Sequence, residues 1–404
     1  MDWQKVGERV LTLFEELTQI PHCSGKTAQL RQFIIDWAEE RGYRVEVDGA
    51  GNIFASKMEK PVVTLQSHYD MVCVGKAPQI ELRKVGDWIE GVDSSIGADN
   101  GLGVATMLVF MELFPEVGYL FTNDEEIGLV GAFNLELDIP SQFLLNLDGA
   151  DFRVYIGSAG GESFVIDYPV RRVSKRGSKG ILKLEGLPGG HSGEDISKPV
   201  PNAIKEWIAR AGEIISIKGG ERDNAIPQWC EGEIFIPMGD EWIEVITSDF
   251  TQFLTKLPHG VIKWDPHYSI PRQSANLAKV DNGKVVLSIR GNTPSDLEEL
   301  EKYVISLLEG CKWEVVGKYP PWPPSPNRLS QLLSQKIGHP PRVIHAGLEC
   351  GVFSAKFPHL QIASFGPIIQ NLHSTRERFL IPSLFEFVKV VEESLEELGD
   401  VSKK

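Results

Sequence analysis

Short apolar runs that each lead into a histidine or an acidic residue constrain the fold of this chain more than any other feature. The first run, residues 61–66, leads into His68 and Asp70. Its length and its β-branched residues are typical of a buried strand, so both side chains lie where the strand emerges into a loop. Ligands and catalytic groups of open α/β sheets gather at the carboxyl ends of strands, and His68 and Asp70 can therefore face one cavity.

The same pattern recurs further along the chain. Residues 118–123 lead into an acidic triplet that ends in Glu125 and Glu126, and residues 142–147 lead into Asp148. Adjacent carboxylates repel one another, and acidic runs usually lie on exposed helix faces or tails rather than directly after a core strand. A cation bound between these carboxylates would remove the repulsion.

Asp99 lies between glycines, just before a helical pattern at residues 102–113. An Asp at a helix start is a common N-cap, which would by itself explain the residue. The flanking glycines exceed what a cap requires, and they would let the backbone approach a bound ion closely. Strand and helix patterns alternate here, and the acidic residues and histidines follow them. This predicts an α/β fold, with a mixed, mostly parallel sheet, helices on both of its faces and a metal site at its edge.

The chain is too long, at 404 residues, for one ordinary core. The alternation of strands and helices gives way to a strand-rich pattern before the middle of the chain, and a proline-rich stretch at residues 318–326 ends that segment. We therefore predict a catalytic domain made of residues 1–161 and 319–404. Residues 162–318 would form an inserted α+β lid domain, in which an acidic and apolar pattern predicts a helix near residues 242–257.

The composition limits the partners of the chain. A formal net charge of −15 opposes binding to nucleic acid or to an anionic membrane. No run of about twenty apolar residues is present to span a bilayer. The chain enters an amphipathic pattern at once, without the basic and then apolar layout of a signal sequence, so we expect a cytoplasmic protein with a small-molecule partner.

The cysteines are odd in number and widely spaced, at Cys23, Cys73, Cys230, Cys311 and Cys350. They contain no Cys-x-x-Cys pair, which fits neither a disulfide framework nor a zinc ribbon, and we expect reduced thiols. Cys350 lies near a motif described below, but no partner histidine supports a role for it as a nucleophile.

The acidic residues and histidines at the predicted strand ends suit metal-assisted hydrolysis. Oxygen and imidazole ligands without thiolates favour zinc, manganese or cobalt over copper or iron–sulfur clusters. A carboxylate such as Asp99 can bridge two such ions, which would hold a hydroxide and a carbonyl oxygen together. A free carboxylate beside them would act as general base and then pass the proton to the leaving amine. Of Glu125 and Glu126, one must take that role while the other binds metal.

An ordered set of motifs along nearly the whole chain resembles the aminoacyl-histidine dipeptidase branch (Xaa-His dipeptidases, carnosinase-like) of the dinuclear zinc peptidases. Its wider relatives include carnosinases, aminoacylases, peptidase T and carboxypeptidase G2. No single motif is specific, but the set in this order is. The motifs are His68-Tyr-Asp70, Gly97-Ala-Asp99-Asn-Gly, Asp124-Glu-Glu126-x-Gly, Asn146-Leu-Asp148, Gly189-Gly-His191-Ser-Gly193, His345-Ala-Gly-Leu-Glu-Cys-Gly351 and Leu372-His373-Ser-x-x-Glu377.

The resemblance implies a phosphorylase/hydrolase-like catalytic domain with two divalent metal ions. Zinc is the expected metal, with cobalt or manganese as alternatives. One ion would bind His68 and Asp148, the other would bind Glu126 and His373, and Asp99 would bridge the two.

Two further roles follow from the resemblance. Glu125 would be the general base, and Asp70 would orient the His68 ring from behind. Residues 91–97 replace the Arg-Gly-Thr type of lead that usually precedes the bridging Asp, and the lid is shorter than the form typical of this branch. Both departures concern substrate preference.

The lid would supply the remaining site residues. The resemblance implies that His191 stabilises the oxyanion or binds the substrate carboxylate, in many relatives from the other subunit of a homodimer formed through the lid. Arg290 is a candidate for binding the substrate carboxylate, and Glu349 is a candidate for binding the substrate amine.

We therefore expect a cytoplasmic dinuclear metallopeptidase that cleaves dipeptides with a free N-terminus, either Xaa-His or a broad range, with a metal-bridged hydroxide as nucleophile. A tripeptide aminopeptidase or an amidohydrolase of N-acyl amino acids could use the same metal centre with different lid contacts. Glu349 separates these alternatives, because a buried acid at the amine end favours a free N-terminus. The third alternative is that the chain is a binding protein without catalytic activity. Retention of every predicted metal ligand together with Glu125 argues against this alternative.

Overall fold

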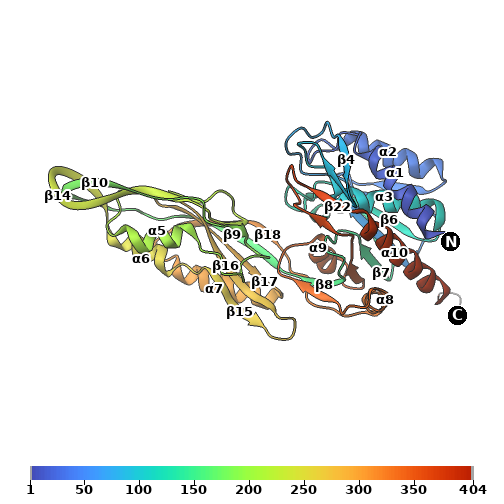
Figure 1. The fold of residues 1–404 in the computed structure, drawn as a ribbon. Helices are drawn as coiled ribbons and strands as arrows, with labels where there is room; N and C mark the ends of the chain where they lie inside the picture. Colours follow the sequence, from blue (N-terminus) through green and yellow to red (C-terminus); the bar gives the residue numbers. More distant parts are fainter. Residues whose placement is uncertain (1, 402–404) are drawn as a thin grey trace. The chain divides into compact units, whose positions relative to one another are not determined.

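The structure, a computed structural model, describes residues 2–401 (Figure 1). The chain forms two compact units. The first unit contains Met1–Ile156, Pro324–Arg342 and Val352–Lys404, and the second contains Gly157–Pro323 and Val343–Gly351.

A mixed eight-stranded sheet lies at the centre of the first unit. The strand β3 pairs in parallel with both β6 and β7, β7 pairs in parallel with β20, and the pairs β1–β2, β2–β6 and β20–β8 are antiparallel. This arrangement confirms the predicted mixed α/β class. In order across the sheet, the strands are β1 (Arg44–Val47), β2 (Ile53–Ser56), β6 (Gly118–Thr122), β3 (Val63–His68), β7 (Phe143–Asn146), β20 (Gln361–Ser364), β8 (Tyr155–Ser158) and β19 (Arg342–Ile344).

The central strands are buried along their whole length, which explains their continuous apolar sequences. Every residue of β3, β6 and β7 is buried. Because these strands are parallel neighbours, their carboxyl ends meet at one edge of the sheet. The residues that follow these strands are thereby brought together from segments that lie far apart in the sequence.

Helices and a small second sheet complete the first unit. Helix α3 is buried all along Leu102–Met111, as expected of a helix that is apolar on every side. No helix among residues 2–401 combines the length and the apolar character needed to cross a membrane. The helices are α1 (Trp3–Leu17), α2 (Ala28–Glu40), α3 (Ala98–Leu113), α4 (Val130–Phe133), α8 (Arg328–Ile337), the part of α9 (Glu349–Lys356) from Val352 onward, and α10 (Ile381–Val401), and the small sheet contains β21 (Ile369–Gln370), β22 (Arg378–Leu380), β5 (Trp88–Gly91) and β4 (Leu82–Val85).

The second unit is an antiparallel sheet with helices α5, α6 and α7 along it (Figure 1). Apolar side chains of these helices and of the sheet form its core. The helices are α5 (Ala203–Ala211), α6 (Ser248–Lys256) and α7 (Pro294–Leu307). In order across the sheet, the strands are β10 (Arg172–Leu184), β14 (Cys230–Ile246), β12 (Lys218–Gly219), β16 (Ile270–Asp281), β17 (Lys284–Gly291), β9 (Gly160–Asp167) and β18 (Lys312–Tyr319); β15 (Gly260–Asp265) pairs with β16, and β11 (Gly190–His191) pairs with β13 (Ala225–Ile226).

The helix predicted near residues 242–257 is wrong over its first part. Trp242 to Ile246 continue strand β14, where they pair with Arg172–Arg176 of β10. Helix α6 begins only at Ser248. The long antiparallel ladder with β10 determines the conformation here, and local periodicity carries no information about that distant partner.

Residues 343–351 belong to the second unit, although the sequence prediction included them in the catalytic segment 319–404. The Ala159 N–H group lies within hydrogen-bond distance of two carbonyl oxygens of this segment, those of Ile344 (3.1 Å) and Ala346 (3.0 Å). These bonds tie the segment to the start of the inserted domain. Glu349 therefore lies in the same unit as the other predicted lid residues.

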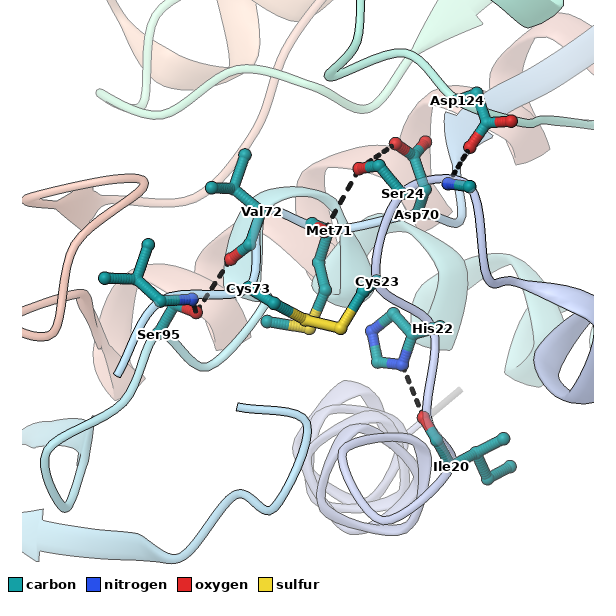
Figure 2. The surroundings of a disulfide bond; sticks show 12 residues. Ile20, His22, Cys23, Ser24, Asp70, Met71, Val72, Cys73, Ser95 and Asp124 are labelled. Carbon is teal, nitrogen blue, oxygen red and sulfur yellow. Dashed lines mark hydrogen bonds between the residues drawn. A yellow bond between two sulfur atoms is a disulfide. The ribbon is translucent and has the colours of Figure 1, made fainter. Parts of the chain in front are cut away.

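Cys23 and Cys73 form a disulfide bond, which corrects the prediction that all cysteines are reduced (Figure 2). The Cα atoms lie 5.4 Å apart because the segments that carry them run side by side. The Met71 N–H donates to the His22 carbonyl oxygen, and the Ser24 N–H donates to the Met71 carbonyl oxygen. The two cysteines are separated by 50 residues in the sequence, and their spacing gave no signal for the bond.

The disulfide predicts the number of reactive thiols. Protein denatured without reductant should expose three thiols to an aromatic disulfide reagent, those of Cys230, Cys311 and Cys350, and reduction should raise the number to five. Cys73→Ser should expose four without reductant, because it frees the thiol of Cys23. Cys311→Ser is the matched control and should expose two. Five thiols in unreduced wild-type protein would show that the bond does not form.

Candidate metal centre

His68 is the last residue of β3, and its side chain is fully buried at the edge of the sheet. Its Nδ1 atom lies 3.0 Å from the backbone carbonyl oxygen of Asp70. A carbonyl oxygen only accepts, so Nδ1 carries the hydrogen and Nε2 is the atom that faces the site. This Nε2 atom lies 3.2 Å from Oδ1 of Asp99 and 3.5 Å from Oδ1 of Asp148.

The Asp70 carboxylate holds several loops of the site together. It accepts the backbone N–H groups of Glu125 (2.9 Å) and Glu126 (3.3 Å) and the Ser24 hydroxyl (2.7 Å). Its Oδ1 atom lies 3.5 Å from Nδ1 of His68. Asp70 was predicted to orient His68, and the closer contact to this ring comes from the Asp70 main chain. The carboxylate itself positions the loop that carries the two glutamates.

The disulfide lies next to this carboxylate (Figure 2). Ser24, whose hydroxyl donates to Asp70, directly follows Cys23, and Cys73 follows Asp70 by three residues. The Gly25 N–H donates to the Asp124 carboxylate at 2.6 Å. The segment that follows Cys23 therefore contacts the loops after β3 and β6 through Asp70 and Asp124.

Asp99 places its two carboxylate oxygens on two different histidines. Oδ1 lies 3.2 Å from Nε2 of His68, and Oδ2 lies 3.2 Å from Nε2 of His373. Asp99 could also be explained as a helix N-cap, but the residue that directly precedes α3 is Gly97, and Asp99 lies at a kink just inside the helix. Asp99 has φ −87° and ψ 105°, outside the helical region, and this conformation turns the carboxylate toward the site.

His373 and Glu126 come from opposite halves of the sequence and meet at Asp99. His373 lies in the loop between β21 and β22 with a positive φ of 56°, a conformation that bulky residues adopt rarely. Its Nε2 atom lies 2.8 Å from Oε1 of Glu126. Strained backbone of this kind concentrates at functional sites.

The potential ligand atoms form three overlapping groups, and the two that share Asp99 suit two divalent ions. Within each group, one ligand atom per residue lies within 4.8 Å of the others. Two groups share Asp99, and a third places Glu125 beside the histidine of the first. The groups are His68, Asp99 and Asp148; Asp99, Glu126 and His373; and His68, Glu125 and Glu126.

The charges of the site require compensating positive charge. Burial, and then the charge of Asp99, raise the pKa of Asp148 to about 7. Burial acts to lower the pKa of His373, but hydrogen bonds with Asp99 and Glu126 outweigh it and raise the pKa to about 11. Burial likewise opposes a positive His68, while the charge of Asp148 and hydrogen bonds with the surrounding carboxylates raise its pKa well above the usual value. Divalent cations would supply this compensation and leave both imidazoles neutral, as ligands must be. The residues therefore fit a dinuclear metal centre.

His191 and Arg290 lie together in the second unit. Both lie close to Gly193, since a Cβ atom at that position would lie 3.2 Å from atoms of both side chains. Nδ1 of His191 accepts the Glu194 N–H at 3.2 Å, so Nε2 carries the hydrogen when the ring is neutral. Arg290 is 8% exposed and donates to the Tyr319 hydroxyl. These groups suit binding of an anionic part of a substrate.

His345, which the sequence analysis named only as part of a motif, belongs to the same group of residues. It is buried, with Nε2 2.7 Å from the Ser274 hydroxyl and Nδ1 2.7 Å from Oδ1 of Asn292. Burial, and then the charge of Arg290, lower the pKa of His345 to about 3. This neutral histidine adds no charge next to Arg290. The sequence signal that could have identified His345 was its position as the first residue of the motif that contains Glu349.

Comparisons with known proteins agree with the predicted resemblance. No model of a protein family matches the chain. The chain is 29% identical to the cytosol non-specific dipeptidase of Escherichia coli, over 96% of each protein. It is 28% identical to the aminoacylhistidine dipeptidase of Vibrio alginolyticus, whose crystal structure superposes with a TM-score of 0.79 over 96% of each chain. A tripeptidase from Staphylococcus aureus, 18% identical with a TM-score of 0.62 over 97% of this chain and 98% of the other, shares the fold.

The two overlapping groups predict the metal content of variants. Wild-type protein dialysed against Co²⁺ or Zn²⁺ should retain about two ions per chain. His68→Ala and His373→Ala should each retain about one, and Asp99→Ala should bind both ions more weakly by about 10- to 100-fold, because it serves both groups. His339→Ala removes an exposed histidine of the same unit and is the control. Elemental analysis and calorimetric titration measure these values, and equal losses for His339→Ala would contradict the assignment.

Proposed function

Because this chain is a peptidase homologous to cytosol non-specific dipeptidase and aminoacylhistidine dipeptidase, we propose that it hydrolyses dipeptides with a free N-terminus, Xaa-His or a broader range, in a dinuclear metal-dependent reaction. The observation that supports this most directly is the Asp99 carboxylate, whose two oxygens face His68 and His373 separately. A bridging carboxylate requires this arrangement.

The ligands divide between the two ions. His68 and Asp148 bind one ion, Glu126 and His373 bind the other, and Asp99 contributes to both. When bound, the two ions supply Lewis acidity that activates water and polarises the scissile carbonyl group. Imidazole and carboxylate ligands favour zinc, with cobalt and manganese as substitutes.

Glu125 is the general base of the proposed reaction. Glu126 shares a group with Asp99 and His373, whereas Glu125 shares one only with His68 and Glu126, and we therefore assign metal binding to Glu126 and proton transfer to Glu125. Its backbone is fixed by the 2.9 Å hydrogen bond to Asp70, so its side chain starts from a defined position. It would take a proton from the attacking water and deliver it to the leaving amine.

The second unit supplies the substrate contacts in this proposal. Arg290 binds the substrate carboxylate, and His191 donates from Nε2 to the same group or to the oxyanion. Glu349 is fully buried at the start of α9 and binds the substrate amine. A site with a cation for one end of the substrate and an anion for the other selects short peptides with both ends free. A tripeptide aminopeptidase keeps only the amine contact, and an N-acyl amino acid amidohydrolase needs neither Glu349 nor a free amine.

We further propose that the chain acts in the cytoplasm as a homodimer formed through the second unit. The location is supported by the cytosolic relative. The edge strand β10 and its neighbour β14 expose large apolar side chains, with Ile181, Trp242 and Met238 between 74% and 82% exposed. An apolar sheet edge is a common surface for association. Sedimentation equilibrium tests the assembly, and a monomer at micromolar concentration would contradict it.

Substrate profiling separates the alternatives. Unblocked dipeptides, Xaa-His among them, should be hydrolysed, and their N-acetylated forms should react at least about 100-fold more slowly, because the amine contact with a buried acid is lost. Chelation should abolish hydrolysis, and zinc, cobalt or manganese should restore it. The measurement is release of free amino acid. Faster cleavage of tripeptides or of acyl amino acids would instead support the corresponding alternative.

Glu125→Gln tests the general base. It keeps the size of the side chain and removes the basic group, so turnover should fall by about 10² to 10⁴ while metal content stays near that of the wild type. Asp124→Asn is the matched control, because it neutralises the neighbouring acid that faces Gly25. Loss of an ion in Glu125→Gln would make Glu125 a ligand, and the roles of Glu125 and Glu126 would then be exchanged.

A further inference from the structure

Glu377 is a buried acid that no step of the proposed reaction uses. It is 2% exposed and lies directly before β22, four residues after His373. Its Oε2 atom accepts the N–H groups of Ile96 (2.8 Å) and Gly97 (3.1 Å), and its Oε1 atom accepts the N–H group of Asp99 (3.3 Å). Both oxygens are therefore occupied by the backbone of the loop that carries Asp99.

These hydrogen bonds supply an acceptor for backbone N–H groups at the start of α3. Gly97 has a positive φ of 63°, Asp99 is not helical, and Gly97, the residue that precedes α3, has no side chain of its own with which to cap the helix. Backbone N–H groups at a helix start need an acceptor, and the positive end of the helix favours an anionic one. The loop also packs closely against Met71, since a Cβ atom on Gly97 would lie 2.9 Å from Sδ of that residue.

Glu377 also stabilises the loop that carries His373. Its own N–H donates to the Ser374 carbonyl oxygen at 3.1 Å, which closes the turn directly after His373. One residue thus contacts the loops of two predicted ligands, Asp99 and His373, and these loops are more than 270 residues apart in the sequence. Glu377 is absent from every group of potential ligands among the described residues, so it is not a candidate ligand.

We propose that Glu377 is a positioning residue that directs the two carboxylate oxygens of Asp99 toward the two ion positions, so that the ions form a bridged pair. The inference rests on the proposed dinuclear function. The three hydrogen bonds hold the main chain of Ile96, Gly97 and Asp99, and close packing of Gly97 against Met71 further limits the movement of this loop. Without the carboxylate of Glu377, Asp99 would turn and bind one ion at a time.

The experiment compares Glu377→Gln with wild type after loading with Mn²⁺. The amide keeps the size of the side chain, but one of its two ends is a donor, so it cannot accept from all three N–H groups. We expect a second ion to bind about 10- to 100-fold more weakly. Electron paramagnetic resonance should show an exchange-coupled pair in the wild type and uncoupled Mn²⁺ in the variant at the same occupancy.

Two further variants separate positioning from general destabilisation. Glu392→Gln neutralises another buried acid, which is 4% exposed on α10 of the same unit, and it should keep the coupled spectrum. Glu377→Asp keeps the charge and both accepting oxygens on a shorter side chain, and it should restore part of the coupling. If Glu377→Gln does not fold, Glu377→Asp provides the test. Weaker binding of the second ion and weaker coupling than in the wild type would support the proposal. Affinity and coupling equal to those of the wild type would overturn it.

The outcomes also separate this inference from the proposed function. A wild-type protein that binds no coupled pair would refute the dinuclear function itself. A wild type and a folded Glu377→Gln variant with the same coupled spectrum and the same two affinities would overturn only the role of Glu377.

Discussion

Negative charge concentrated at the carboxyl ends of the parallel strands in a mixed sheet is the constraint on which the first unit depends. Asp99, Glu126 and Asp148 meet at this edge because the elements that carry them are neighbours, and two imidazoles lie among them. Carboxylates at such distances stay ionised only beside positive charge, whether protons on the histidines or bound cations. A sheet of parallel strands can build this concentration because it delivers several loops to one place.

Two kinds of buried carboxylate share this edge, and they are distinguished by what they bind. Asp99, Glu126 and Asp148 face histidine nitrogens and are available to cations. Asp70 and Glu377 instead accept backbone N–H groups of the loops that carry the first kind. Hydrogen bonds from backbone N–H groups hold a carboxylate in place without removing its charge. Asp70 and Glu377 therefore fix the positions of the loops that carry the predicted ligands. Such supporting contacts are a general requirement of metal sites.

The second unit gathers a different chemistry, suited to an anionic group and not to a metal. Arg290 and His191 both lie close to Gly193, and the buried His345 stays neutral beside them. The hydrogen bonds of His345 to Ser274 and Asn292 join the segment 343–351 to the sheet of this unit. Through this link, Glu349 comes to lie in the same unit as Arg290.

The sequence by itself determined the mixed α/β class and the strand ends at which His68, Glu126 and Asp148 lie, because burial of a short parallel strand leaves a continuous apolar run that ends at the functional edge. It also identified Asp99 and His373 through motifs. Only the tertiary structure decided the Cys23–Cys73 disulfide, the strand at 242–246, the place of residues 343–351 and the contacts of Glu377. Each of these depends on a partner distant in sequence, and local periodicity, spacing and propensity contain no information about which distant segments pack together.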